Sequence, residues 1–520
     1  MNKLKYIFLI VSGFVMISCM KDLGNYKYED VGKPQIGNLP ASISVTIPDN
    51  LKITPTVNIP ENDCKTVWFV QIKDKTANDV ETYADTLSRQ LSLDVPFEYP
   101  VGAYTLYLKV TDKTTGVSEY ASTEVSVISG YSTGYYLLKE TIDGNTELDF
   151  HRTDGNVFSD LIAKSNGTAL NGKPKTLSYL NGYCYLNETT GQNDINSLLV
   201  ALSEKDCVTL NMMDMSQARG YDQWYFDSSN IYPVEKIHHF NNLCYSYGMF
   251  AEDGLFTNYQ CAAWEMYSSG KLASSADIMM DGTLRYSCAS DVCYFVYSAY
   301  FYDSLNSAIN YVNLNGECYK AKLQYTPLTS GQNPKLEKLA DRVIYVGGVS
   351  PEDNYVIIIC EREDGSKYLY YALADEQVLN IEAKSEITLE SAFDGSVRYA
   401  TCRKGSNYVY SLYNNEIYAM NPDNGQVAKL VLPDLPAGEI TCFDTMYYDH
   451  PEVGYNHFVV ATYKDGAYTV SFYEMIGGEP VAEKSPVITF SGIGRVKTLQ
   501  HTDPGKQGNG VGEYTYSLHY

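Results

Sequence analysis

Tight-turn dipeptides are concentrated in the part of the chain that follows residue 130. Asp-Gly occurs seven times and Asn-Gly six times, and all thirteen dipeptides lie in that part. Both dipeptides accept the positive φ angles of two-residue hairpin turns, and helical periodicity is almost absent between them. The pattern therefore predicts an all-β fold built from antiparallel strands.

Apolar segments recur between these turns at intervals of roughly fifty residues, which is close to the repeat length of β-propeller blades. The recurring segments are 135–138, 183–186, 243–245, 294–297, 355–359, 408–410 and 457–461. Radial closure leaves only short sheet edges exposed, so we expect residues 130–520 to form a β-propeller. Seven blades fit the length, and six or eight are the alternatives because the repeats are degenerate. We expect the segment Glu513–Leu518 to pair with the start of the ring and close it.

Residues 40–129 show a different pattern. Apolar and polar residues alternate along the short segments 42–47, 66–70, 104–110 and 123–127. Several short alternating segments in a region of this size are typical of an immunoglobulin-like β-sandwich. Trp68 lies on one of these segments, and we expect it in the sandwich core.

The N-terminus has the pattern of a lipoprotein signal. Two lysines precede the apolar stretch 6–17, which is too short to span a membrane. The stretch ends at Met16-Ile17-Ser18-Cys19, which resembles a bacterial lipobox. We therefore expect residues 1–18 to be a removed signal peptide, Cys19 to carry lipid, and residues 19–39 to form a tether. The alternative is a plain cleaved signal followed by an incidental cysteine.

Charge and cysteine content limit the partners further. The chain has 39 Lys and Arg against 63 Asp and Glu, a net charge of −24, which excludes a nucleic-acid groove as its main function. Of the 12 cysteines, only Cys288 and Cys293 are close in sequence, and either a hairpin disulfide or two packed thiols would account for them. No CxxC pair occurs, which disfavours a structural zinc site.

Motifs near the N-terminus carry a family resemblance. Gly24-Asn25-Tyr26-Lys27-Tyr28 follows the lipobox, and the segment from Gly102 to Gly116 resembles the final strands of PKD-like domains. In this order of features the chain resembles the PKD-like lipoproteins of Bacteroidetes. The resemblance implies a lipid-anchored, cell-surface protein of the outer membrane. It also implies a role in nutrient uptake beside an importer of the starch-utilisation type, a TonB-dependent transporter with a lid lipoprotein.

Motifs that would mark catalysis are missing from the sequence. It has no Gly-x-Ser-x-Gly elbow, no Walker loop and no sialidase Asp box, and no feature requires a cofactor. His238 and His239 are neighbours on an expected strand and should point to opposite faces, so we do not expect them to share a metal. The hairpin 421–425 could hold Ca²⁺, but its turn-forming residues are a sufficient explanation. The sequence does not exclude a pair of catalytic carboxylates of the glycosidase type.

Aromatic side chains supply the candidate ligand site. The polar segment 218–233 is too long for a tight hairpin and contains one of the three tryptophans. We expect Trp224, Tyr221, Tyr225 and Phe226 to form an exposed stacking platform on one face of the propeller. Further candidates are Trp264, Tyr300 and Tyr302. The alternative is that these rings pack between blades.

Three functions remain compatible with the sequence. The leading hypothesis is a non-enzymatic surface lipoprotein that binds a nutrient, either peptide or glycan, for an outer-membrane importer. The second is a propeller hydrolase or lyase that acts on polysaccharide or peptide through carboxylates at the central channel. The third is a structural subunit of the importer that binds no ligand.

Overall fold

The computed structural model describes most of the chain after residue 31. The described residues are 32–76, 79–97, 99–187, 191–225, 231–242, 247–258, 270–272, 285–295, 298–326, 339, 341–349, 354–382, 387–389, 391–396, 398–402, 406–448 and 455–502. The chain separates into two compact units, residues 1–127 and 128–520. None of the described helices has the length and apolar character needed to cross a lipid bilayer.

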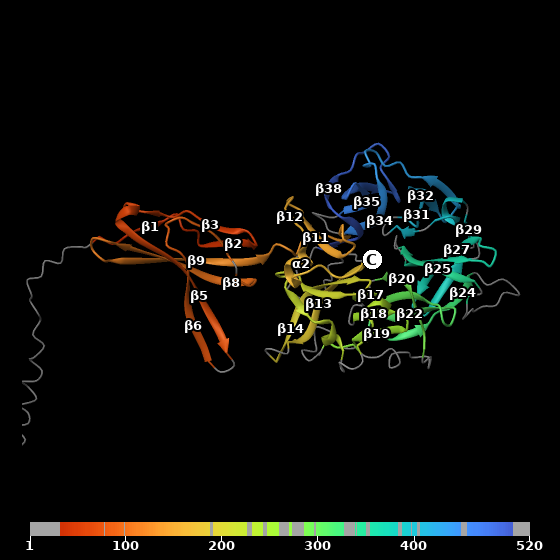
Figure 1. Ribbon diagram of the computed structural model, residues 1–520, viewed down its shortest axis with the longest axis horizontal. Coiled ribbons are helices and arrows are strands. Elements are labelled where there is room, and N and C mark those ends of the chain that lie inside the picture. Colours follow the sequence, from red (N-terminus) through yellow and green to blue (C-terminus); the bar gives the residue numbers. More distant parts are fainter. Residues whose placement is uncertain are drawn as a thin grey trace, which may run out of the picture. The chain divides into compact units, whose positions relative to one another are not determined.

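The first unit is a β-sandwich, drawn in red to orange in Figure 1. Its larger sheet has the strand order β2 (Ser42–Ile47), β9 (Ser118–Ser129), β8 (Gly102–Asp112), β5 (Cys64–Thr76) and β6 (Asp79–Ser88). Two small sheets pair β3 (Asn50–Ile53) with β7 (Leu93–Pro96) and β1 (Ile36–Gly37) with β4 (Thr56–Val57). A short 3₁₀ helix, η1 (Glu61–Asp63), precedes β5.

Alternating apolar residues of this sandwich form a single core. In β9 the burial alternates strictly from Thr123 to Val127, as expected of a strand with one face on the core. Trp68 is fully buried there, and its indole Nε1 donates a hydrogen bond to the carbonyl oxygen of Leu91 at 3.0 Å. The predicted core position of Trp68 is confirmed.

The described strands of the second unit form seven sheets, numbered here from sheet 1 to sheet 7. Sheet 1 comprises β12 (Val157–Phe158), β11 (Thr146–Arg152), β10 (Gly134–Glu140) and β39 (Arg495–Thr502). Sheet 2 comprises β13 (Pro174–Asn187), β14 (Gln192–Ser203), β15 (Cys207–Asn211) and β16 (Gln217–Arg219). Sheet 3 comprises β17 (Ile237–Asn242), β18 (Tyr247–Ala251) and β19 (Gly254–Asn258). Sheet 4 comprises β20 (Cys288–Phe295), β21 (Ser298–Asp303), β22 (Ala308–Asn313) and β23 (Cys318–Lys320).

The remaining sheets complete the second unit. Sheet 5 comprises β25 (Arg342–Val349), β26 (Tyr355–Glu361), β27 (Lys367–Asp375), β28 (Val378–Glu382), β24 (Lys322–Thr326) and β29 (Ile387–Thr388). Sheet 6 comprises β30 (Arg398–Thr401), β31 (Val409–Tyr413), β32 (Glu416–Asn421) and β33 (Gln426–Lys429). Sheet 7 comprises β34 (Glu439–Tyr448), β35 (Tyr455–Lys464), β36 (Ala467–Ile476), β37 (Glu479–Pro480) and β38 (Ile488–Ile493). The described helices of this unit are α2 (Leu161–Asn166), η2 (Tyr221–Trp224), η4 (Val234–Lys236) and α3 (Ser391–Asp394).

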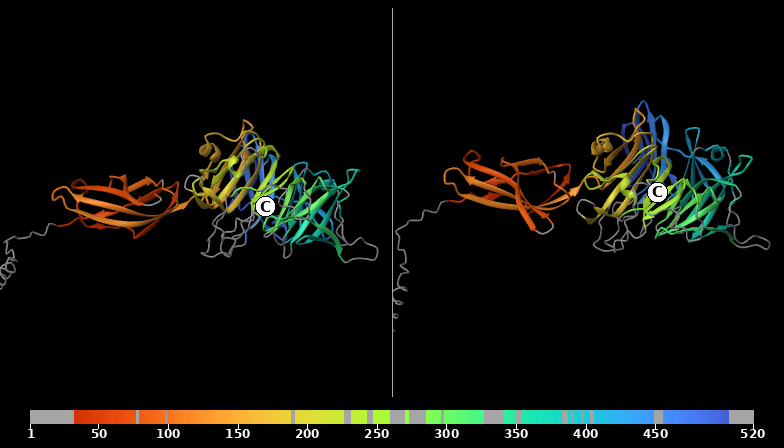
Figure 2. Two further views of the ribbon diagram at one scale, coloured as in Figure 1. Left: turned by 90° about the horizontal axis from the view of Figure 1, so that it is seen from below. Right: turned by 60° about the horizontal axis from the view of Figure 1, so that its bottom comes forward.

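These seven sheets are arranged around a common centre, as Figures 1 and 2 show. Each sheet has one innermost strand, and these inner strands contact one another in the cyclic order β39, β13, β17, β20, β25, β30, β34 and again β39. Seven apolar clusters separate consecutive sheets around the same cycle. The all-β, propeller-type fold predicted from the turn dipeptides is confirmed.

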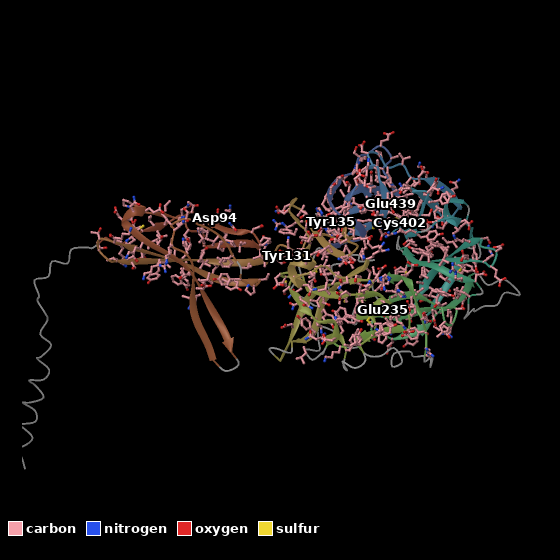
Figure 3. The ribbon with its side chains drawn as sticks, in the orientation of Figure 1. Asp94, Tyr131, Tyr135, Glu235, Cys402 and Glu439 are labelled. Atoms are coloured by element: carbon pink, nitrogen blue, oxygen red, sulfur yellow. The ribbon has the colours of Figure 1, made fainter. Side chains whose placement is uncertain are left out.

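Both faces of most strands are therefore covered by neighbouring sheets. Strand β26 is buried from Val356 to Cys360 without alternation, which is the pattern of a strand packed on two sides. Aromatic side chains are also buried between sheets, as Tyr135 is between sheets 1 and 7 (Figure 3). The hairpin turns also follow the sequence, because Asp465 and Gly466 have the two positive φ angles, 52° and 87°, of a type I′ turn.

The ring is closed by strand β39. It pairs antiparallel with β10, the first strand of the unit, so sheet 1 contains residues from both ends of the second unit. The segment Glu513–Leu518, which was expected to close the ring, lies outside the described residues.

A buried polar network strengthens the contact between sheets 1 and 7. Lys139 Nζ lies 2.7 Å from Asp149 Oδ1, and the hydroxyl of Tyr468 donates to Asp149 Oδ2 at 2.9 Å. That hydroxyl has one proton, so His151 Nε2, at 2.8 Å, must donate to its oxygen. Burial lowers the pKa of His151 to about 4, so the imidazole is neutral at pH 7.

The low pKa of His151 makes stability dependent on pH. The unfolded chain binds a proton at this histidine below about pH 6.5, while the folded protein does not until about pH 4. The contribution of the neutral His151 to the free energy of unfolding is therefore present above about pH 6.5, and it is lost progressively as the pH falls toward 4. We expect His151 alone to lower the free energy of unfolding by about 1 kcal/mol between pH 7 and pH 5.5.

Urea unfolding at the two pH values, followed by circular dichroism, measures this effect. His151→Gln should show a smaller loss of stability between pH 7 and pH 5.5 than the unmodified protein. An identical pH dependence in the two proteins would contradict the assignment of a neutral, buried His151.

Candidate functional site

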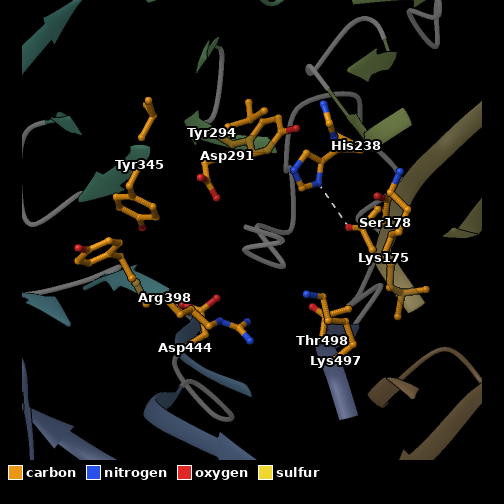
Figure 4. A pocket seen from close by; sticks show the side chains of 18 of the residues that line it. Lys175, Ser178, His238, Asp291, Tyr294, Tyr345, Arg398, Asp444, Lys497 and Thr498 are labelled. Carbon is orange, nitrogen blue, oxygen red and sulfur yellow. Dashed lines mark hydrogen bonds between the residues drawn. The ribbon is translucent and has the colours of Figure 1, made fainter. Parts of the chain in front are cut away.

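The centre of the ring contains a cavity of about 1080 Å³. Its walls are formed by side chains from the inner strands of all seven sheets, β13, β17, β20, β25, β30, β34 and β39. Figure 4 shows charged, polar and aromatic side chains from several of these strands pointing toward the same space. A volume of this size can hold a ligand of a few sugar or amino-acid units, because small-molecule sites span roughly 300–1,000 Å³.

β-bulges bring many of these side chains to the centre. In a regular strand, side chains alternate between the two faces of its sheet, and here both faces are covered by neighbouring sheets. Six of the seven inner strands shift register against their partner strands near their first residues. These strands are β13, β17, β20, β25, β34 and β39. A bulge leaves an extra residue unpaired and redirects its side chain.

The extra residues include three basic side chains. Lys175, His238 and Lys497 are each skipped in the pairing of β13, β17 and β39, and all three line the cavity. Asp291 lies in the longer irregularity of β20 and also lines the cavity. Strand β30 has no bulge, and its first residue, Arg398, contributes the remaining cation of this inner group.

The surroundings of Lys497 and Arg398 are electrostatically unusual. Lys497 stands in the open cavity, yet the surrounding walls lower the pKa of its ammonium by desolvation, and the nearby Arg398 lowers that pKa further. Arg398 Nη1 donates to the carbonyl oxygen of Thr441 at 2.9 Å. Its guanidinium also lies 5.7 Å from the ring centroid of Phe443.

Lys175 and His238 form a second basic pair. Lys175 Nζ donates to the carbonyl oxygens of Glu235 at 2.8 Å and Ile237 at 2.5 Å, so the ammonium is fixed against the wall. Burial lowers the pKa of Lys175, and surrounding carboxylates oppose this effect. Burial also lowers the pKa of His238, and the charge of Lys175 lowers it further.

Aromatic rings line another side of the cavity. Tyr345 and Tyr399 are both half-buried, with ring centroids 5.6 Å apart and planes inclined by 46°. Gly347 permits this position, because a Cβ at residue 347 would lie 2.6 Å from the ring of Tyr345. The hydroxyl of Tyr399 donates to the carbonyl oxygen of Phe393 at 2.5 Å, which holds that ring in place.

The aromatic platform expected around Trp224 is wrong as a surface site. Trp224 is completely buried between sheets 2 and 3, and its indole Nε1 donates a hydrogen bond to Thr209 Oγ1 at 3.3 Å. Tyr225 is also buried, and Tyr221 is half-buried with its hydroxyl 2.6 Å from that of Tyr225. The 3₁₀ helix η2 turns these rings inward, where Arg219 lies over Trp224 at 5.5 Å.

The other aromatic candidates are either buried as well or lie outside the described residues. Tyr300 and Tyr302 are buried between sheets 4 and 5, and the Tyr300 hydroxyl donates to the carbonyl oxygen of Glu376 at 2.6 Å. Phe226 and Trp264 lie outside the described residues, as does Cys19. Packing between sheets, the alternative stated for these rings, accounts for the described ones.

Three further expectations can be compared with the structure. His238 and His239 both line the cavity, contrary to the expectation of opposite faces, because the bulge at His238 breaks the alternation. Cys288 and Cys293 are both buried and do not form a disulfide with each other. In the hairpin 421–425, Asn421 Oδ1 accepts a hydrogen bond from the amide of Asp423 at 2.9 Å, as a turn requires. Within the described residues, His, Cys, Asp and Glu side chains form no cluster of three or more that could hold a metal ion.

Sequence reasoning missed the residues that line the cavity. The available signal was a charged or histidine residue near the start of a strand, as at Lys175, His238, Asp291, Arg398 and Lys497. An isolated charge before a strand normally marks a solvated turn, so this signal is not specific without the ring geometry.

Comparisons with known proteins find similarity to a family model and to solved structures. A PKD-like family model matches residues 19–174. None of the curated proteins matches the chain. A quinonprotein alcohol dehydrogenase-like protein from Bacteroides thetaiotaomicron is similar at 12% identity and a TM-score of 0.42, over 90% of this chain and 99% of that one. An auxiliary nutrient binding protein from the same organism is similar at 10% identity and a TM-score of 0.29, over 81% of this chain and 95% of that one.

The buried position of Trp224 generates a prediction opposite to that of a surface platform. Trp224→Ala should lower the free energy of unfolding by about 3–5 kcal/mol, because it removes a large ring from a packed core. Chemical unfolding measures the loss, and Tyr120→Ala, at an exposed position of the sandwich, is the control that should change stability little. A Trp224→Ala protein of unaltered stability would contradict the packing described here.

Proposed function

We propose that the protein is a non-enzymatic surface lipoprotein that captures a small nutrient ligand, a peptide or a glycan, in the central cavity of its ring. The observation that carries the proposal is the set of bulges that direct polar side chains of the inner strands into one cavity. Bulged strands next to a cavity are a common way to present functional side chains. Tyr345 and Tyr399 add an apolar surface on which a sugar ring or side chain can stack.

Binding is favoured over catalysis by the arrangement of the wall. Among the described lining residues, Thr176 Oγ1 lies 3.4 Å from His239 Nδ1. This distance is longer than the 2.6–3.2 Å expected between a nucleophile and its general base. A hydrolase or lyase therefore remains the second candidate.

The membrane anchor and the importer belong to the same proposal. The PKD-like family model begins its match at residue 19, the cysteine of the lipobox pattern. A lipid at Cys19 would hold the protein on the outer membrane, and stable anchoring by acyl chains normally needs more than one chain. Beside a TonB-dependent transporter and its lid lipoprotein, the cavity would raise the local concentration of ligand near the entrance.

A ligand in the cavity should depend on Tyr345. Tyr345→Ala should weaken binding of a cognate tripeptide or oligosaccharide by roughly ten- to a hundredfold, since a stacked aromatic anchor contributes about 1–3 kcal/mol. Calorimetric titration of a panel of tripeptides and linear oligosaccharides, with Tyr120→Ala as the control, measures the effect.

Two outcomes would contradict this assignment. Binding that is unaffected by Tyr345→Ala would place the ligand outside the cavity. Release of product from any member of the panel, abolished by a carboxylate substitution in the cavity wall, would replace the binding function with the hydrolase or lyase.

The anchor can be tested separately. Cys19→Ala should move the protein from the membrane fraction to the soluble fraction of cells, because the acceptor of the lipid is removed. Fractionation followed by detergent phase partitioning measures the change. Membrane association of Cys19→Ala at the level of the unmodified protein would contradict lipidation at this residue.

A further inference from the structure

We propose that the ligand of the central cavity is anionic and that Lys497 and Arg398 hold its acidic group, with Lys175 as a further positive charge on the wall. The inference rests on the proposed function, since it names the class of ligand that the same cavity would take. The chemistry is that of an oxyanion, and a uronic acid sugar and the C-terminal carboxylate of a peptide are its two sources.

Lys497 is the central residue of this site. It is the extra residue of the bulge in β39, and its side chain is exposed in the cavity. It makes no hydrogen bond or ion pair with any described residue, although the walls desolvate it. An ammonium in such a position gains from an anion that enters the cavity, because the anion replaces the interactions with water that the walls remove.

Arg398 supplies a second cation with unused donors. Within the described residues, its guanidinium donates hydrogen bonds to the carbonyl oxygen of Thr441, at 2.9 Å, and to Cys442 Sγ, at 3.7 Å. A guanidinium has five N–H donors in a planar fork, so several stay available for the oxygens of a carboxylate or sulfate. The Phe443 ring below the guanidinium fixes its plane.

Lys175 adds a further positive charge to the cavity wall from the next inner strand. Strand β13 is the neighbour of β39 in the ring, and both strands direct their bulge residues into the cavity. The two carbonyl oxygens that accept hydrogen bonds from Lys175 Nζ hold the ammonium in one place without neutralising its charge. An ammonium has three donors, so one stays available for a ligand.

The basic side chains form two pairs, and within each pair one positive charge disfavours the protonated form of the other side chain. Arg398 lowers the pKa of Lys497, and Lys175 lowers the pKa of His238. This crowding of cations occurs in a chain whose net charge is −24. An anionic group would relieve the repulsion, which is the electrostatic argument for the class of ligand.

The carboxylates that line the cavity do not remove this argument. Glu361 is paired with Arg342 at 2.5 Å, and Glu204 and Glu235, which raise the pKa of Lys175, are exposed to solvent. Asp291 and Asp444 are the other lining carboxylates. The influence of Asp291 on the pKa of Lys497 is smaller than that of Arg398, and Asp444 accepts a hydrogen bond from the amide of Thr445 at 2.8 Å.

These two aspartates allow an experiment to distinguish a peptide ligand from an acidic sugar ligand. A peptide with free ends would place its carboxylate on Lys497 and Arg398 and its ammonium toward an aspartate, while a uronic acid sugar carries no such ammonium. Asp291→Asn should therefore weaken the binding of a peptide more than that of an acidic sugar. Equal effects on both would favour neither source and would leave the oxyanion contact as the shared requirement.

Matched pairs of probes test the proposal on the full protein. The pairs are digalacturonate and its methyl ester, and a tripeptide with a free and with an amidated C-terminus, with inorganic sulfate as the minimal anion. We expect the acidic member of at least one pair to bind at least tenfold more tightly than its neutral partner. Lys497→Gln should remove most of that difference, while Lys497→Arg should keep it.

A matched control isolates the role of the cavity. Lys429→Gln removes one positive charge from the outer strand β33, where Lys429 pairs with Glu416, and should leave both members of each pair unchanged. Lys497→Arg retains the charge, so it reports on the site even where Lys497→Gln folds poorly.

The possible failures are distinguishable. Equal binding of acidic and neutral members, sensitive to Tyr345→Ala, would overturn the anion site and leave the cavity as the ligand site. Preference for the acidic member that survives Lys497→Gln would overturn the assignment to this residue group. Binding of no probe, including sulfate, would overturn both this inference and the proposed function.

Discussion

The pairing of β39 with β10 is the interaction on which the second unit depends. It places the last described strand beside the first strand of the unit and so completes sheet 1 from both ends of the second unit. Radial sheets bury their faces against one another, and an open ring would expose two such faces to water. The network of Lys139, Asp149, His151 and Tyr468 lies at this same junction, where breaking a buried ion pair costs about 3–5 kcal/mol.

Closure of the ring also creates the cavity and decides which residues can reach it. Since the faces of the sheets are occupied by packing, only the inner edges and the irregular residues of the inner strands face the centre. The β-bulges at Lys175, His238 and Lys497 therefore have a functional consequence, because they add three basic residues to the wall that Arg398 of the regular strand β30 also lines. Buried tyrosines such as Tyr135 and Tyr300 fill the interfaces between sheets, while Tyr345 and Tyr399 line the cavity.

The sequence was sufficient for the fold and insufficient for the site, for physical reasons. Turn dipeptides and alternation act locally, so they predicted the sandwich, the core position of Trp68 and the antiparallel sheets of the ring. Trp224 was misplaced because a polar segment flanking a tryptophan looks the same whether its rings face solvent or a neighbouring sheet. Lys497 was missed because a bulge depends on the register of two strands that are far apart in sequence.

The central claim is that ligand binds among the inner strands rather than on an outer surface. A crystal structure of the protein with a ligand from the binding panel tests this claim most directly. The account predicts ligand density within the cavity, in contact with Tyr345 and with at least one of Lys175, Arg398 and Lys497. Density on the outer strands or on the sandwich, with an empty cavity, would contradict it.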